Sequence, residues 1–411
     1  MVPFCPSSVA HSLGRMKALQ LAYFYLPNNS PGARRAYYVG LELARAGDLY
    51  VLSSQELVTK FDHAKEAISV NAPDLRSLSG VKTVSVRTAK STVVSRLLPL
   101  RQAFPFLFVT DDGGPVYRRK AYQEACALIE KHGITTVFSS FRPWSDHLVA
   151  ARLKKRFPAI RWIADFRDLP VDPVHQTIWW PSLQRWWGKR IIRSADEVWM
   201  VSEGQRQQMS GWHPNIKVRY NALADLPPDR TAPLSQHFTI AYTGSLYPDM
   251  RTPEKLVAAL RSLLDAGRLD ENKVRLVYRG KDDSYFRSFT NGLPECMLDV
   301  ESSITADAAK AIQANAQLLL LLTWSAPGYY GVLTAKLWEY LSTGRPILAL
   351  VKGPGDPELK KIIETAEAGA VFSDQESALL EKWLLENYEK WLEAGTLPWS
   401  TNRLGLKQYL V

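Results

Sequence analysis

The sequence has little cysteine, and nothing in it suggests a framework built from cysteines. Cys5, Cys126 and Cys296 are the only three, they lie far apart, and none forms a CxxC pair. Neither a disulfide framework nor a cysteine zinc site is therefore indicated, and a reducing cytoplasm is the expected compartment. The seven histidines include no HxxxH or HExxH spacing, which argues against the helix-borne zinc hydrolases.

Long apolar runs are also missing. No stretch reaches the roughly 18 apolar residues that a membrane-spanning helix needs, and the longest candidate, residues 318–322, is far too short. The start of the chain lacks the basic residues and apolar stretch of a signal peptide. Since Met16 and Lys17 lead into an apolar strand-like run, we expect residues 1–16 to be an N-terminal lead, either an upstream extension or disordered.

Signatures of several enzyme classes are absent as well. No GxGxxG follows a predicted strand, which argues against a nicotinamide dehydrogenase. Neither GxSxG nor a P-loop occurs, so serine hydrolases and P-loop NTPases lack their usual motifs.

The chain does have length and a regular alternation of elements. Its 411 residues exceed the roughly 250–300 that one core can organise, so we expect two domains. Short apolar runs alternate with amphipathic helical stretches throughout, which predicts α/β domains with parallel, doubly wound sheets. The predicted strands are 18–26, 48–53, 134–139, 160–164, 197–201, 237–242, 273–278, 317–322, 346–351 and 369–372. The predicted helices are 34–46, 117–131, 145–156, 183–194, 253–265, 305–314, 333–343, 356–366 and 376–392.

A cluster of prolines and polar residues at 223–236 predicts the boundary between the domains. We therefore expect two Rossmann-like domains facing a central cleft. The predicted divisions are an acceptor-binding domain at 17–225, a linker at 226–236, a nucleotide-sugar-binding domain at 237–375, and a C-terminal helix within 376–411 that packs back toward the N-terminal domain.

The segment GYYGVLTAKLWEYL, residues 328–341, carries the strongest site pattern. A glycine-containing turn opens a helix, and the free N–H groups at a helix start favour an anion. Lys336 adds a positive charge there, and Glu339 shares its face three residues on. Together with Gly331 and Thr334, these residues suit a diphosphate and the hydroxyls of a ribose. An ordinary amphipathic helix with a surface ion pair is the alternative.

Other candidate residues follow the predicted strands, because open parallel sheets bind ligands beyond the carboxyl ends of their strands. In the second domain, Arg251 and Arg279 could stabilise the charge of a departing nucleoside diphosphate, and Gly244, Ser245 and Gly280 lie in the same loops. In the first domain, Asp165 and Asp168 flank Arg167, and they could orient a sugar hydroxyl, act as a base, or clamp the arginine. Asn29 and Arg142 are further candidates for acceptor contacts there, and His147 is a candidate proton shuttle or a local hydrogen-bonding residue.

Residues 179–193, WWPSLQRWWGKRIIR, combine tryptophan with basic residues on one predicted helix. Arg185, Lys189 and Arg193 recur every fourth residue beside Trp186 and Trp187, a pattern that suits an anionic membrane surface. The alternative is that the tryptophans pack into the domain and the cations form a solvated face. The net charge of +10 does not point to nucleic acid, because the basic residues are dispersed and no nucleic-acid module is visible.

Several segments resemble glycosyltransferase family 4-like enzymes of the GT-B fold, also called glycosyl transferases group 1. YTGSLYPD, LVYRGKDD and GVLTAKLWEYLSTGRPILAL resemble their second domain, whereas IADFRDLP, RSADEVWMVSEG and VRYNALAD resemble the end of their first. The likeness spans about residues 17–390, and KLWEYLSTGRPIL is its strongest piece. It implies a nucleotide-diphosphate-sugar donor bound by the second domain, an acceptor bound by the first, and retention of anomeric configuration.

Many members of that family use two glutamates eight positions apart. The second matches Glu339, the expected ribose partner, whereas the first falls on Gly331. The sequence also lacks the Asp-x-Asp triplet with which GT-A enzymes hold a metal. We therefore expect metal-independent transfer with no cofactor besides the sugar nucleotide.

The sequence thus predicts a cytoplasmic, hexosyltransferase-like enzyme of polysaccharide biosynthesis, peripheral at the inner face of a membrane. It would move a sugar to a glycan or a lipid-linked saccharide, with no nucleic acid as a partner. A catalytically inactive protein of the same shape that only binds or scaffolds remains an alternative, favoured by Gly331. A sugar-nucleotide epimerase or a phosphorylase on the same fold is another.

Overall fold

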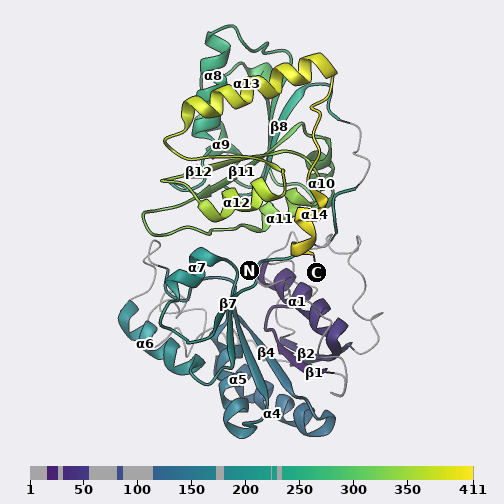
Figure 1. Cartoon of the computed structure of the whole chain (residues 1–411), viewed down its shortest axis with the longest axis vertical. Coiled ribbons are helices and arrows are strands. Elements are labelled where there is room, and N and C mark those ends of the chain that lie inside the picture. The colour runs from purple at the N-terminus through teal and green to yellow at the C-terminus, as the bar shows by residue number, and fades with distance from the viewer. Residues whose placement is uncertain are drawn as a thin grey trace. The chain divides into compact units, whose positions relative to one another are not determined.

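A computed structural model of the chain describes residues 16–25, 31–54, 81–86, 114–172, 180–223, 225–228 and 234–410, with residues 81–86 as backbone only. The predicted lead at 1–16 lies outside these ranges except for Met16, which begins the first strand. The chain forms two compact units, Met1–Val201 with Arg206–Tyr220, and Ser202–Gln205 with Asn221–Leu410. Figure 1 shows a sheet surrounded by helices in each unit.

The first unit is built on a seven-stranded sheet whose neighbouring strands all pair in parallel. The strand order is β3-β2-β1-β4-β5-β6-β7. The strands are β1 (Met16–Leu21), β2 (Gly47–Ser54), β3 (Val81–Val86), β4 (Thr136–Phe141), β5 (Arg161–Phe166), β6 (Glu197–Met200) and β7 (Ile216–Val218). The helices are α1 (Pro31–Ala46), α4 (Gly114–His132), α5 (Trp144–Arg156), α6 (Pro181–Ile192) and α7 (Glu203–Gln208), the last of which begins within Ser202–Gln205 of the second unit.

The second unit repeats the arrangement with six parallel strands in the order β10-β9-β8-β11-β12-β13. The strands are β8 (Phe238–Thr243), β9 (Val274–Arg279), β10 (Leu298–Glu301), β11 (Leu318–Trp324), β12 (Ile347–Lys352) and β13 (Gly369–Phe372). The helices are α8 (Glu254–Asp265), α9 (Asp283–Phe289), α10 (Ala306–Asn315), α11 (Ala335–Leu341), α12 (Pro357–Thr365), α13 (Ser377–Ala394) and α14 (Arg403–Leu406), with short 3-10 turns at Glu295–Met297 and Lys407–Tyr409. In both sheets the order reverses beside the first strand, which is the Rossmann-like arrangement. The prediction of two such domains is confirmed.

The central strands form because their side chains are apolar on both faces. All seven residues of β11 are buried, as parallel strands covered by helices on both sides require. The helices show the complementary pattern, as in α8, where buried residues recur along one face. α12 begins where Asp356 accepts hydrogen bonds from the N–H groups of Glu358 and Leu359, with Pro357 in the first turn.

The sequence pattern missed the shorter elements near the sheet edges. β7 and β10 have only three and four residues and are partly exposed, so neither gives a continuous apolar run. α7 and α9 have six and seven residues, too few to establish a helical period. β3 was not among the predicted strands either.

The C-terminal helix α13 belongs to the core of the second unit. Leu384, Tyr388 and Trp391 of α13 are buried in the hydrophobic core of this unit, beside Phe238 of β8. Aromatic side chains of this size bury large apolar areas. The helix thus completes the core of its own unit, and the expected packing toward the N-terminal domain stays a prediction.

Among the described residues, no helix combines the length and the apolar character needed to cross a membrane.

We expect Leu384→Ala to lower the free energy of unfolding by about 2–5 kcal/mol, because Leu384 is 1% exposed and its loss leaves a cavity. Leu379→Ala on the same helix is the matched control, since Leu379 is 55% exposed and should change stability by less than about 0.5 kcal/mol. Urea denaturation measures both. Equal effects would show that α13 does not pack as described.

Candidate functional site

Two predicted site residues meet where the strand order of the second sheet reverses, between β8 and β11. Gly244 follows β8 with a φ of 141°, and a Cβ on it would overlap with Nζ of Lys336. Lys336 belongs to α11, which follows β11. Its ammonium group therefore lies directly against the backbone of Gly244, an approach that only glycine permits.

Gly280 extends the same edge after β9. A Cβ on Gly280 would overlap with the carbonyl oxygen of Gly244. The N–H of Gly244 donates a hydrogen bond to the carbonyl of Arg279 at 2.7 Å. The structure thus brings Gly244, Gly280 and Lys336 together, with the backbone of Gly244 against Gly280 and the Lys336 side chain against Gly244.

Arg251 provides a second cation at this edge. Its guanidinium carbon lies 4.8 Å from the ring centre of Tyr247, and its Nε is buried with no hydrogen-bond partner among the described residues. Nζ of Lys336 lies 5.7 Å from the ring centre of Tyr242. Burial raises the pKa of the Tyr242 hydroxyl, whereas the positive charge of Arg251 lowers it. Lys336 and Arg251 therefore both lie close enough to Tyr242 to interact with it. The Tyr242 hydroxyl donates to the carbonyl of Ser245 at 2.7 Å, which fixes the loop between them.

α11 begins after Thr334, close to the predicted start. Oγ1 of Thr334 is buried and has no hydrogen-bond partner in the described part of the chain, although a threonine at this position usually accepts one from the helix. Glu339 lies three residues after Lys336 and is half-buried. Because α11 has only seven residues, the charge at this edge comes from side chains more than from a helix dipole.

Gly331 cannot be replaced by a glutamate without strain. Its φ is 78°, and a Cβ on it would lie 2.6 Å from Oε2 of Glu358 and 2.8 Å from Oγ of Ser202. Its N–H donates to the carboxylate of Asp356 at 2.8 Å, while Glu358 accepts from the N–H groups of residues 203 and 204 at 2.6 and 3.0 Å. Two buried carboxylates therefore surround the position where the resemblance places the first glutamate.

The prediction that Arg279 stabilises a departing diphosphate is not supported. The Arg279 guanidinium contacts both carboxylate oxygens of Asp299, at 2.8 and 3.0 Å, and Glu301 at 3.1 Å. Both acids belong to β10, and the register of this strand with β9 brings Glu301 opposite Arg279. Since two carboxylates already neutralise this charge, Arg279 fixes the sheet edge.

Asp165 also serves the structure rather than the acceptor, contrary to our prediction. It is fully buried, and both oxygens accept hydrogen bonds from Arg35 of α1, at 2.9 and 2.5 Å. Arg35 also donates to the carbonyls of Arg219 and Tyr220. The clamp on Asp165 thus comes from Arg35 and not from Arg167. A bidentate buried pair of this kind leaves no free carboxylate for catalysis.

His147 is a core residue, so its predicted role as a proton shuttle is wrong. It is fully buried among aromatic rings, with its ring centre 4.6 Å from that of Phe166. Nδ1 bonds to the Ser139 hydroxyl at 2.7 Å, and that hydroxyl accepts from the Trp162 indole at 2.8 Å. Burial lowers the pKa of His147 to about 3, which keeps it neutral at physiological pH.

Three first-domain candidates stay at the surface. The guanidinium of Arg167 lies against Gly32 in the first turn of α1, where a Cβ would be 2.8 Å away, and Nε of Arg167 is 3.3 Å from the half-exposed carboxylate of Asp168. Arg142 follows β4, is exposed, and lies 5.7 Å from the ring of Phe141. Asn29 lies outside the described residues. These positions are compatible with the predicted acceptor contacts, which stay a prediction.

Four buried charged residues that form hydrogen bonds between distant segments were not predicted from the sequence. Asp356 and Glu358 had a signal, because Asp-Pro-Glu is a typical helix start. Arg35 and Asp146 had none, since their partners come from distant segments. Asp146 accepts from the hydroxyl of Tyr117 at 2.7 Å and from the N–H of residue 23 at 2.8 Å, and burial raises its pKa to about 7.

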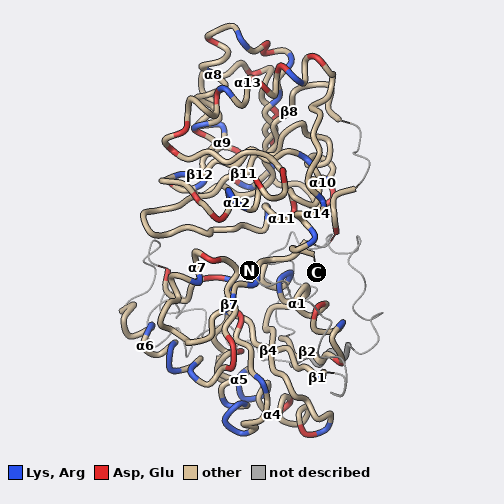
Figure 2. Tube along the Cα trace, viewed as in Figure 1, with Lys and Arg blue, Asp and Glu red and all other residues tan. Residues whose placement is uncertain are grey.

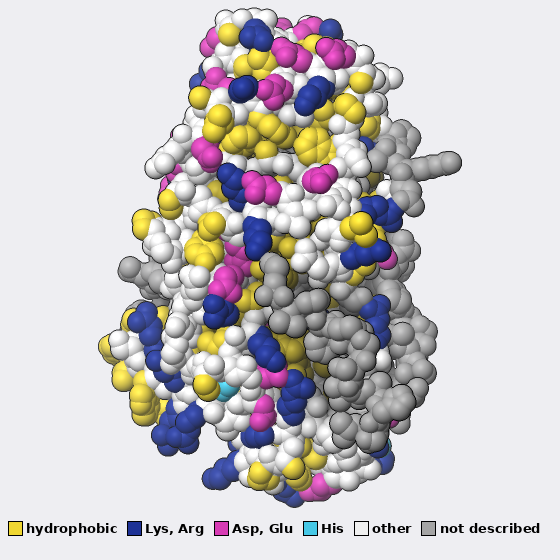
Figure 3. Space-filling model, viewed as in Figure 1, with side chains coloured by type: hydrophobic (Ala, Val, Ile, Leu, Met, Phe, Trp, Pro, Cys, Tyr) yellow, Lys and Arg dark blue, Asp and Glu magenta, His cyan; other side chains and the backbone are white. Residues whose placement is uncertain are grey.

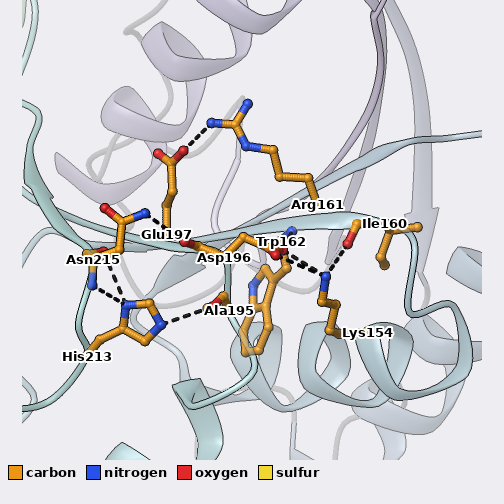
Figure 4. Close-up of polar contacts among 9 residues, drawn as sticks. All are labelled: Lys154, Ile160, Arg161, Trp162, Ala195, Asp196, Glu197, His213 and Asn215. Carbon is orange, nitrogen blue, oxygen red and sulfur yellow. Dashed lines mark hydrogen bonds and ion pairs between the residues drawn. The ribbon is translucent and has the colours of Figure 1, made fainter.

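A separate polar network lies at the amino ends of β5 and β6 (Figure 4). Asp196 accepts from Nζ of Lys154 at 2.9 Å and from the N–H of Trp162 at 2.7 Å, and Nε2 of His213 bonds to the carbonyl of Ala195 at 3.0 Å. Ligands of parallel sheets bind at the opposite edge. The network therefore fixes the turn that joins α6 to β6.

A separate cavity of about 370 Å³ lies in the second unit. It is lined by residues at or beside β8, β9, β10 and α10, including His237, Arg275 and Asp299, and none of the predicted site residues lines it. Within the described ranges, no three His, Cys, Asp or Glu residues lie together in a way that could hold a metal ion.

No family model matches the chain, and no curated protein matches its sequence. Solved structures do match over nearly its whole length. Sucrose-phosphate synthase from Thermosynechococcus elongatus shares 14% identity at a TM-score of 0.58, covering 96% of this chain and 94% of its own. An E. coli structure described as trehalose-6-phosphate bound with UDP-2-fluoro glucose shares 11% at a TM-score of 0.55, covering 95% of each chain.

A third similar structure is described as a UDP-N-acetylglucosamine 2-epimerase from Listeria monocytogenes. It shares 11% identity at a TM-score of 0.50, covering 96% of this chain and 94% of its own. Since these structures match both Rossmann-like units over nearly the whole chain, the chain has the GT-B fold of glycosyltransferases, as the resemblance implied.

We expect Asp165→Ala to destabilise the protein by about 3–5 kcal/mol, because it leaves the buried Arg35 charge unpaired. Asp168→Ala should cost less than about 1 kcal/mol, since its carboxylate is 51% exposed. Thermal and urea unfolding measure both. If the Asp165→Ala protein remains as stable as the native protein and loses only acceptor binding, the predicted acceptor contact of Asp165 would be supported instead.

The low pKa of His147 predicts a loss of stability in acid. The unfolded chain protonates this side chain below about pH 6.5, whereas the folded chain resists protonation down to about pH 3. Lowering the pH from 7 to 5 should therefore cost the native protein about 2 kcal/mol through His147 alone. Urea denaturation of His147→Gln should show a pH-dependent loss smaller by that amount; an unchanged loss would mean that His147 titrates normally.

Proposed function

We propose that the chain is a glycosyltransferase that moves a sugar from a nucleotide-diphosphate-sugar donor to a glycan or a lipid-linked saccharide. The observation that carries the proposal is the contact of the Lys336 ammonium group with the backbone of Gly244, at the point where the second sheet reverses its order. The GT-B fold supports the class of reaction, and one similar structure was solved with UDP-2-fluoro glucose.

The donor would bind to the second unit through its diphosphate. Lys336 and Arg251 would neutralise the phosphate oxygens, and the Thr334 hydroxyl, which has no hydrogen-bond partner among the described residues, could donate to one of them. Glu339, on the same helical face as Lys336, would accept hydrogen bonds from the ribose hydroxyls. Gly244 and Ser245 would line the edge with backbone groups.

In the transfer, the bond between the anomeric carbon and the diphosphate oxygen breaks, the acceptor oxygen bonds to that carbon, and the departing diphosphate accepts the proton of the acceptor hydroxyl. The departing diphosphate gains negative charge as the bond breaks, which Lys336 and Arg251 would stabilise. We propose that these cations allow departure without a divalent metal, and that configuration is retained as in the family 4-like enzymes. The acceptor would bind to the first unit through Arg142, Arg167 and Asp168.

A lipid-linked acceptor would place the enzyme at the cytoplasmic face of a membrane, in polysaccharide biosynthesis. One alternative is a sugar-nucleotide epimerase, favoured by the similar structure described as a 2-epimerase. An epimerase would release a product without any acceptor. The other is a binding protein without catalysis, favoured by Gly331, where no acidic side chain fits. Product analysis with a panel of nucleotide sugars, with and without acceptor, separates the three.

Lys336→Ala and Glu339→Ala should each raise the dissociation constant of the donor nucleotide at least tenfold, which is about 1.4 kcal/mol. Lys361→Ala is the control, because Lys361 is exposed on α12 and is not among the proposed donor contacts. The nucleotide is identified first by a thermal-shift screen with UDP, GDP, ADP, CMP and dTDP, since a ligand at 100 times its dissociation constant adds about 2.7 kcal/mol.

Isothermal titration calorimetry with the selected nucleotide then compares the variants. Binding unchanged in both site variants would remove the donor site from this edge. Equal weakening in Lys361→Ala would mean that the nucleotide responds only to overall charge.

A further inference from the structure

The positive charge of the chain is concentrated in its first half. Residues 1–220 carry 31 Lys and Arg against 17 Asp and Glu, whereas residues 221–411 carry 20 against 24. The net charge of +10 therefore arises entirely from the part of the sequence that forms the first unit. Figure 2 shows basic positions along α4, α5 and α6 of that unit.

α6 is fixed to its unit by one face. A Cβ on Gly188 would lie 2.6 Å from the ring of Trp212, so the helix backbone packs directly on that tryptophan. Gln184 is buried and donates to the carbonyl of Pro170 at 2.6 Å. Ile191 and Ile192 are buried on the same side. The opposite face is therefore held in a fixed orientation toward solvent.

That outer face is apolar at its centre. Trp186 is 56% exposed, Leu183 is 46% exposed, and Trp180, at the start of the helix, is 57% exposed. Trp180 has a φ of 53°, a left-handed conformation that is costly for a bulky residue. Figure 3 shows apolar and basic side chains together on the part of the surface where Figure 1 labels α6. Water-exposed rings of this size are unfavourable unless something covers them.

Cations flank the apolar centre. Leu183, Trp186 and Arg190 are spaced three and four residues apart and so form one row, with Lys189 and Arg193 beside it. Arg185, Lys189, Arg190 and Arg193 are all exposed, and within the described ranges none forms an ion pair with an acidic side chain. Trp187 is half-buried with its ring 5.6 Å from that of Trp186, so it supports the patch from inside.

We propose that this face of α6, made by Trp180, Leu183, Trp186, Lys189, Arg190 and Arg193, docks on the surface of an anionic lipid bilayer. Tryptophan rings favour the interface between headgroups and acyl chains, and basic side chains favour anionic headgroups. A single convex helix face that presents both suits a planar bilayer. The excess positive charge of the first unit draws it toward the same surface.

The test is co-sedimentation of the full-length protein with vesicles of phosphatidylcholine that contain about 30% phosphatidylglycerol. The anionic lipid gives the vesicles a negative surface potential. The variant Trp186→Ser with Lys189→Gln and Arg193→Gln should bind at least tenfold more weakly than the native chain. Raising the salt from roughly 0.05 M to 0.5 M should weaken native binding, because it screens charges at the surface.

The matched control is Leu392→Ser with Lys382→Gln and Lys390→Gln, which removes one exposed apolar side chain and the same charge from α13 of the second unit. It should bind as the native chain does. Circular dichroism melting confirms that both variants remain folded, as expected for changes at exposed positions.

Three results would overturn the proposal. Native protein that does not bind the anionic vesicles at low salt would exclude the bilayer. Equal loss in the control variant would show that binding follows net charge alone. Self-association or binding to single-stranded DNA that competes with vesicles and depends on Trp186 would assign the face to another partner. None of these results bears on donor binding, so the glycosyltransferase proposal stands or fails by its own experiment.

Discussion

The contact between the Lys336 side chain and the backbone of Gly244 holds an ammonium group at the edge where the second sheet reverses its strand order. A side chain at position 244 would displace the ammonium group from the sheet edge, and the φ of 141° excludes most residues there in any case. Because β8 and β11 are neighbours at the reversal of strand order, a helix that follows one can bring its lysine onto the loop that follows the other. Arg251 follows β8 and Thr334 directly precedes α11, so both belong to the loops of this same edge.

The charged residues that look catalytic from sequence divide into two groups by burial. Asp165 forms a buried ion pair with Arg35, and Arg279 pairs with the partly exposed Asp299 and Glu301, whereas Lys336, Arg251 and Arg142 lie nearer the surface. These pairs at the carboxyl ends of strands hold the loops in place, and a fixed loop is a condition for stabilising charge in a transition state. The paired charges thus fix the loops that carry the residues proposed to bind the donor.

The two units share a topology but differ in charge. One sheet pattern, with its order reversed beside the first strand, occurs twice in the chain. The basic residues are nevertheless concentrated in the first half, and the exposed tryptophans of α6 lie in the same unit. Charge balance has little effect on the packing of the sheet, because the basic side chains of helices such as α6 are exposed. The donor site that we propose in one unit and the docking surface that we propose in the other are therefore compatible with one shared topology.

The sequence by itself determined the helices and strands that have a clear hydrophobic period, and the order in which they alternate along the chain. Buried strands such as β11 appear as apolar runs, and the helix start at Asp356 follows a local rule, so neither depends on distant contacts. Only the tertiary structure decided which charged residues are taken up by buried partners. Arg35 lies 130 residues from Asp165, and His147 is enclosed by rings from several segments. Whether a carboxylate is available or already paired depends on side chains brought together by folding, and local spacing carries no information about them.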